Sequence, residues 1–380
     1  MTKEWVFANA KIVTATEIIE GAVLIRDGLI ADISTSGAAR ADRDLDGAYL
    51  LPGLVELHTD HLEGHYAPRP KVRWNPIAAV LAHDAQVATA GITTVLDALR
   101  VGMDEDADLT LADIRKLADA IEDSVAQDRL RADHFLHLRC EVSAPDCLQA
   151  FADFDRDDRV KLASLMDHAP GQRQFVNLET YAYYYQRKLK LTDRDFKLFC
   201  EKRMAESARY SAPNRAVIAA ACRERGIVLA SHDDATSGHV DEAIEQGVRV
   251  AEFPTTEEAA RASKAAGLGV LMGAPNVMRG ASHSGNVSAR ALAGDGLLDI
   301  LSSDYIPFSL IQSAFFLGDM VEGISLPQAV AMVSKNPAEA IGLTDRGVIE
   351  QGRRADLVRV RVDDHVPVVR TVWRQGRRVA

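Results

Sequence analysis

Cysteine is scarce in this sequence. Only four cysteines occur among 380 residues, Cys140, Cys147, Cys200 and Cys222, and no two of them stand in a C-x-x-C pair. A disulfide framework or a zinc knuckle needs denser and more regular spacing. We therefore expect buried structural thiols.

Long apolar runs and excess basic charge are also missing. No run approaches the roughly 20 apolar residues that a membrane span needs, and the first ten residues do not resemble a secretory signal. The formal net charge of -11 argues against binding to nucleic acid, which requires a basic face. The expectation is a soluble cytoplasmic protein without membrane or nucleic-acid partners, and a homo-oligomer stays open.

Both ends of the chain carry short β-type runs with turn signals. Asp27-Gly28 lies between two apolar runs and predicts a hairpin, because glycine tolerates the positive φ of a tight primed turn. Residues 1–50 and 346–380 are therefore predicted to form one small β-sandwich domain, and residues 51–345 a second domain.

Eight apolar runs in the middle of the chain alternate with helical patterns that often stop at glycine. Continuous apolar runs are typical of parallel strands covered on both faces, and eight successive β/α units predict an α/β fold, the (β/α)8 TIM barrel. The predicted strands are 54–60, 91–99, 134–142, 160–168, 226–234, 250–255, 269–276 and 297–305.

The interval 169–225 is too long for a single crossover helix. We expect extra helices there, covering one mouth of the barrel. Its tyrosine run, "YAYYY", has two interpretations, a helix face that packs on the protein or a stacking surface for a sugar or base. Packing is favoured, since aromatic residues at helical spacing are usually part of a core.

Polar residues gather where the predicted strands end. In a TIM barrel these ends converge on one mouth, and buried histidines and carboxylates are costly there unless they are paired or bind a metal. We predict a divalent metal site, with two ions and with Zn²⁺, Mn²⁺ or Fe²⁺ equally compatible. The predicted ligands are His58, Asp60, Glu141, His168, His232 and Asp304.

Two carboxylates in this set are assigned catalytic roles. Glu141 is the candidate bridge between the ions, and Asp304 is the candidate acceptor of a proton from the attacking water. Asp304 has an alternative as a helix N-cap, which the "SSD" string before "YIPFSL" also permits. Whether His61, Glu63 or His65 contributes a ligand stays open.

Several longer strings resemble the amidohydrolase superfamily of metal-dependent barrel hydrolases. They are "LPGLVELHTD", the His168 and His232 strand ends, "SSD", "SKNPAEAIGL" and "DRGVIEQGRRADLVRV". The sequence departs from that pattern at His58-Thr59-Asp60, where the superfamily usually has H-x-H. It also lacks a lysine at the end of strand three or four, which supports Glu141 as the bridge.

Further strings resemble one branch of that superfamily. "HLRCEV", "SLMDHAPGQRQF", "LASHDDAT", "EFPTT" and "VLMGAPNVMRGASHSGNVSA" are specific as a set. The resemblance implies hydrolysis of a ribose 5-triphosphate between its α and β phosphorus atoms, which releases pyrophosphate in phosphonate breakdown. The small-molecule partner would then be a sugar triphosphate.

An anionic substrate of this kind needs local cations in an acidic protein. Basic segments follow the predicted first, fourth and seventh strands, although the first could also be a solvated charge run and the glycine-rich loop at 279–286 a simple connector. The predicted substrate contacts are Arg69, Lys71, Arg173, Asp233, Arg279 and His283.

Two other functions stay in view. One is hydrolysis of an amide or cyclic C–N bond, which needs a similar metal site without a polyphosphate cradle. The other is a barrel that binds a phosphorylated ligand without turning it over. The number of metal-type residues at the strand ends argues against the second.

Overall fold

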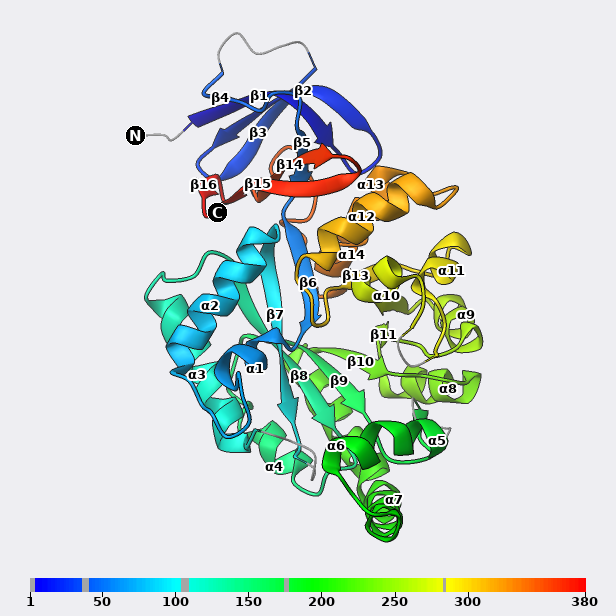
Figure 1. Cartoon of the computed structure of the whole chain (residues 1–380). Helices are drawn as coiled ribbons and strands as arrows, with labels where there is room; N and C mark the ends of the chain where they lie inside the picture. Colours follow the sequence, from blue (N-terminus) through cyan, green and yellow to red (C-terminus); the bar gives the residue numbers. More distant parts are fainter. Residues whose placement is uncertain (1–3, 36–40, 104–108, 174–177, 283–284) are drawn as a thin grey trace.

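A computed structural model describes residues 4–35, 41–103, 109–173, 178–282 and 285–380 (Figure 1). One of its two sheets has eight strands in the order β13-β12-β11-β10-β9-β8-β7-β6, and the neighbours pair in parallel. The strands are β6 (Leu54–Thr59), β7 (Ile92–Val101), β8 (Asp133–Glu141), β9 (Val160–Met166), β10 (Val228–His232), β11 (Val250–Glu252), β12 (Gly269–Gly273) and β13 (Ile300–Ser302).

The first and last of these strands close the sheet into a barrel. A parallel bridge pairs Thr59 with Asp304, and the Asp304 amide donates to the His58 carbonyl at 3.1 Å. The predicted barrel is confirmed, and each predicted strand overlaps an observed one. The seventh predicted strand, 269–276, corresponds to β12 and ends earlier, at Gly273. Gly273 is the N-cap of helix α10, and Pro275 in the first turn of that helix has no amide hydrogen to donate to a neighbouring strand.

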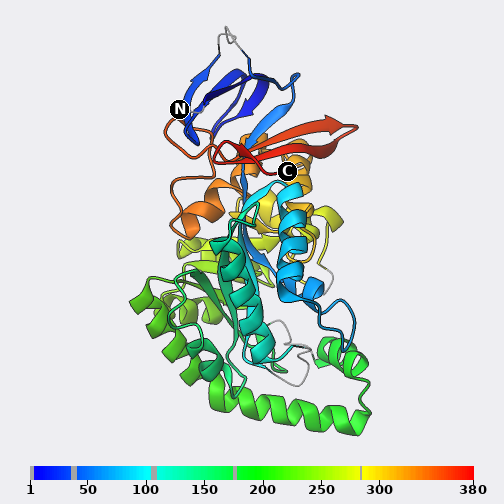
Figure 2. The same cartoon turned by 90° about the vertical axis from the view of Figure 1, so that its left-hand side faces the viewer.

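Helices follow most strands and surround the barrel, as the two views show (Figure 1, Figure 2). Asn75 caps α2 by accepting from the Ala78 amide, and Thr110 forms a capping box on α3. The helices are α1 (His61–Tyr66), α2 (Pro76–Thr89), α3 (Leu111–Ala126), α4 (Cys147–Ala152), α8 (Ser237–Gln246), α9 (Glu257–Ala265), α10 (Ala274–Arg279), α11 (Ala289–Gly294), α12 (Ser309–Met320), α13 (Leu326–Ala331) and α14 (Lys335–Ala340).

The long interval after β9 holds additional helices, as expected. They are α5 (Leu178–Tyr181), a π-helical segment (Ala182–Gln186), α6 (Arg187–Leu189) and α7 (Asp193–Arg225). Tyr181 and Tyr185 are buried with Phe199, and the two tyrosine rings lie 4.5 Å apart between centroids. Packing is therefore the role of these two tyrosines.

A second sheet joins both ends of the chain, as predicted. Its order is β16-β15-β14-β5-β1-β2-β3, with β4 paired to β1. The strands are β1 (Glu4–Val13), β2 (Ile18–Arg26), β3 (Leu29–Ser34), β4 (Arg43–Asp44), β5 (Tyr49–Pro52), β14 (Leu357–Asp363), β15 (Val366–Arg374) and β16 (Arg377–Arg378). Asp27 and Gly28 form the predicted hairpin turn with φ of 51° and 82°. The domain boundaries at residues 50 and 346 stay a prediction.

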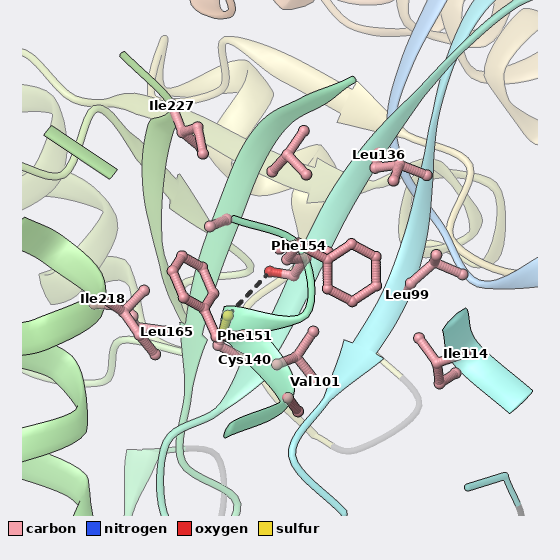
Figure 3. Packing of buried hydrophobic residues seen from close by; sticks show 14 of the residues in the cluster. Leu99, Val101, Ile114, Leu136, Cys140, Phe151, Phe154, Leu165, Ile218 and Ile227 are labelled. Carbon is pink, nitrogen blue, oxygen red and sulfur yellow. Dashed lines mark hydrogen bonds between the residues drawn. The ribbon is translucent and has the colours of Figure 1, made fainter. Parts of the chain in front are cut away.

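Separate apolar clusters hold the layers together. Figure 3 shows the one between the strands and the outer helices, where Leu99, Leu136 and Leu165 pack near Phe151 and Ile218. All four cysteines are buried and free, as expected. Within the described ranges, no helix is long and apolar enough to cross a membrane.

Asp133 ties the terminal sheet to the barrel. Asp133 lies at the start of β8. Its carboxylate oxygens form ion pairs with the guanidinium nitrogens of Arg346, Arg354 and Arg374 at N···O distances of 2.7, 2.7 and 3.1 Å. The Arg346 and Arg354 side chains are only 7% and 8% exposed, so loss of their shared anion would leave these buried charges with Asp345 and Asp356 as their remaining partners.

Asp133→Asn is expected to lower the free energy of unfolding by about 2 kcal/mol, because three arginines lose one counter-charge. Asp128→Asn is the matched control. Asp128 pairs with Arg377 on the surface and is 69% exposed, so its replacement should cost less than about 1 kcal/mol. Urea denaturation at pH 7 measures both, and equal midpoints for the two variants would contradict this role of Asp133.

Candidate metal centre

Three of the predicted histidines come together at the barrel mouth. His58 ends β6, His232 ends β10, and His168 follows β9. The His232 ring lies 5.9 Å from that of His58 and 5.6 Å from that of His168, between centroids. The convergence of parallel strand ends thus brings together residues up to 174 positions apart in the sequence.

Two groups of possible metal ligands share His232. One consists of His58, His232 and Glu252, and the other of His168, His232 and Asp233. Within each group the ligand atoms all lie within 4.8 Å of one another. This spacing and the mixture of imidazole and carboxylate suit a divalent transition metal.

The surroundings of Glu252 test whether these residues suit a metal ion. Its side chain is fully buried at the end of β11, with Oε1 3.1 Å from Nδ1 of His58. The other oxygen, Oε2, has no hydrogen-bond partner among the residues that the structure describes. A buried carboxylate oxygen without a donor is costly, and a bound cation would remove that cost.

Sequence reasoning did not find Glu252 as a ligand, and it assigned Asp233 to the substrate. The signal for Glu252 was present, since "VAE" ends an apolar strand in a carboxylate just as "HLRCE" does for Glu141. Asp233 has a φ of 58°, which is uncommon outside glycine, and its Oδ2 lies 2.9 Å from Nδ1 of His232.

Glu141 lies beside this centre and is surrounded by donors. It accepts from Nδ1 of His168 at 2.6 Å and from Oγ of Ser143 at 2.7 Å, while Arg100 and Arg203 each approach to 3.7 Å. Burial alone would raise the pKa of Glu141, but these cations hold it well below its usual range. Burial likewise opposes the charge on His168, yet Glu141 raises the pKa of that histidine to about 10. The bridging role of Glu141 stays a prediction.

Asp60 and Asp304 lie on neighbouring parts of the mouth. Asp60 precedes α1 and accepts from Arg139 at 3.2 Å. Asp304 has a left-handed φ of 55° and does not cap a helix, since α12 begins at Ser309 with Phe308 in the cap position. The N-cap alternative for Asp304 is therefore wrong, which leaves its carboxyl group available to the mouth.

The predicted substrate contacts have different surroundings. Arg69 and Lys71 are exposed between α1 and α2, and Arg279 is exposed at the end of α10. Arg173 is buried and donates to Asp234 and, at 2.6 Å, to Glu242. His283 lies outside the described residues. Arg100 and Arg203 approach Glu141, and Arg139 pairs with Asp60. The sequence did not predict these three arginines, because each contacts a carboxylate on another element.

The sequence and the fold match known proteins. Residues 90–380 match the amidohydrolase family, and this chain belongs to that family. It is 50% identical over 374 residues to the alpha-D-ribose 1-methylphosphonate 5-triphosphate diphosphatase of Escherichia coli (strain K12), covering 98% of this chain and 99% of that protein. It is also 25% identical over 397 residues to imidazolonepropionase of Deinococcus deserti, covering 96% and 93%. The resemblance noted in the sequence is confirmed.

Solved structures share the fold. N-acetyl-D-glucosamine-6-phosphate deacetylase from Mycobacterium smegmatis has a TM-score of 0.65 at 17% identity, with 99% of both chains covered. A D-hydantoinase has a TM-score of 0.62 at 17% identity, covering 100% of this chain and 95% of that one. At such identities the likeness supports the architecture alone.

Asp60 is expected to influence the protonation of Asp304. Burial, together with the nearby negative charge of Asp60, raises the pKa of Asp304 to about 7. Asp60→Asn removes that charge, so the Asp304 carboxyl group of metal-free protein should titrate at lower pH. Carboxyl carbon NMR of protein labelled at aspartate measures the change, with Asp304→Asn to assign the signal. An unchanged or higher pKa would show that the two groups do not interact.

Proposed function

We propose that this chain hydrolyses α-D-ribose 1-methylphosphonate 5-triphosphate to the 5-phosphate and pyrophosphate during phosphonate breakdown. The observation that carries the proposal is the 50% identity to the Escherichia coli diphosphatase across nearly the whole of both chains. Buried histidines and carboxylates at the barrel mouth support a metal-assisted reaction there. We further propose two divalent ions, with Zn²⁺, Mn²⁺ and Fe²⁺ as the candidates.

Some of the proposed metal ligands were predicted from the sequence, and others are added from the structure. Divalent ions, when bound, make water more acidic and neutralise charge on phosphate oxygens. His58, His168 and His232 would hold them with Asp60, Glu141 and Asp304, and Glu252 and Asp233 join the set because they lie within the two ligand groups.

Asp304 is the proposed acceptor of the proton from the attacking water. A carboxyl group with a pKa raised to about 7 is a stronger base than an ordinary aspartate, and it is half-deprotonated near neutral pH. The Asp304 amide donates to the His58 carbonyl, so the backbones that carry the two side chains are held together.

The polyphosphate would be bound by cations at the rim. In a chain with a net charge of -11, Arg69, Lys71 and Arg279 are exposed basic residues in the segments that follow β6 and β12, and His283 belongs to the same proposed set. Arg173 shares its charge with Asp234 and Glu242, so it would act mainly by fixing the loop after β9.

Chelation is expected to abolish turnover, and divalent metal to restore it. Phosphorus NMR of the reaction should then show pyrophosphate and a ribosyl 5-phosphate in equal amounts. Release of single orthophosphate would reject the proposed bond position. Full turnover after exhaustive chelation would reject the metal-dependent mechanism.

Arg279→Ala separates this function from hydrolysis of a neutral amide. If Arg279 binds the polyphosphate, kcat/KM for the triphosphate should fall by about 10- to 100-fold, the effect of losing a hydrogen bond to a charged group. Arg361→Ala, at a 67% exposed position in the terminal sheet, is the control and should leave kcat/KM unchanged. Equal values for the two variants would exclude Arg279 from substrate binding.

A further inference from the structure

Three more histidines form a second cluster, between α1 and α2. His61 and His65 lie one turn apart on α1, and His83 lies on α2, which packs against α1. The three ring centroids are separated by 4.9 Å (His61 to His65), 6.2 Å (His61 to His83) and 6.0 Å (His65 to His83). Histidines four residues apart on one helix face are a common arrangement for a metal ion.

The two ring nitrogens of His83 have different surroundings. Its Nε2 lies 2.8 Å from Oδ1 of Asp97, and a carboxylate can only accept, so Nε2 carries the hydrogen. In the neutral ring, Nδ1 then offers a lone pair. The His83 side chain is fully buried, and Nδ1 finds no donor in the part of the chain that the structure describes.

Asp97 is well suited to support a metal-binding histidine. Its second oxygen lies 2.8 Å from Nδ1 of His134. Although burial opposes a charge on His134, Asp97 and Asp84 raise the pKa of that histidine to about 10, so His134 already balances Asp97. A carboxylate behind the imidazole is the usual means of orienting a metal ligand, and His83 has it.

The side chain of Gln86 contacts the rings of both His61 and His65. Its Oε1 accepts from Nε2 of His61 at 2.8 Å and from Nε2 of His65 at 3.0 Å. Two imidazole nitrogens thus point at one atom, as they would at a cation. The cluster is more open than the groups at the barrel mouth, since its nitrogens do not all lie within 4.8 Å of one another. His61 and His65 are partly exposed.

We propose that His61, His65 and His83 bind a divalent transition metal of the Zn²⁺ class, with Oε1 of Gln86 as fourth ligand. Imidazole nitrogens favour such ions, and four ligands complete a closed tetrahedral site. The hydrogens on His61 and His65 move from Nε2 to Nδ1 when the ion binds, so no proton is released. The ion would join α1 to α2 outside the two ligand groups of the barrel mouth.

The first test is the zinc content of intact protein equilibrated with buffered free Zn²⁺ and measured by elemental analysis. His65→Phe should bind one zinc per chain fewer than the unmodified protein, while pyrophosphate release at saturating metal stays the same. His365→Phe, at a 92% exposed position, is the matched control and should lose none. Equal zinc content in all three proteins would overturn the proposal.

A second test does not depend on any substitution. Crystals of the unmodified protein soaked in Zn²⁺ should give an anomalous peak between α1 and α2, separate from any peak at the barrel mouth. A peak at the mouth without one between the helices would overturn this site and leave the proposed function standing. A peak between the helices alone would support this site and would exclude zinc, but not Mn²⁺ or Fe²⁺, as the ion of the barrel mouth.

Discussion

The first and last barrel strands are joined through the buried carboxylate of Glu56. Its two oxygens accept from the amides of His58 at 2.7 Å and Ser303 at 2.6 Å, and burial raises the pKa of this side chain to about 8. One carboxyl group thereby fixes the backbone beside two residues of the mouth, His58 and Asp304. This contact holds the ends of β6 and β13 together, and it thereby positions His58, which belongs to the ligand group with His232 and Glu252.

Charge around the mouth is arranged in local pairs. Arg139 meets Asp60, Arg173 meets Asp234, and Arg100 and Arg203 approach Glu141. Pairing of this kind keeps buried charges tolerable in an acidic protein.

Much of the fold could be predicted from the sequence, because buried parallel strands are read directly as continuous apolar runs. The strand ends also located His58, His168 and His232. Glu252 could have been found by the same rule. Arg203 could not, because it lies on α7 and meets Ser143 only through tertiary packing. Nothing in local sequence fixes which face of a 33-residue helix turns inward.

His232 is the residue that both ligand groups of the barrel mouth share. The most direct measurement is the metal content and pyrophosphate release of His232→Asn, whose fold is checked by its thermal unfolding. We predict that this variant folds normally, loses the ions bound at the barrel mouth and releases no pyrophosphate. A folded His232→Asn protein with full metal content and full turnover would contradict the assignment of the catalytic centre to this mouth.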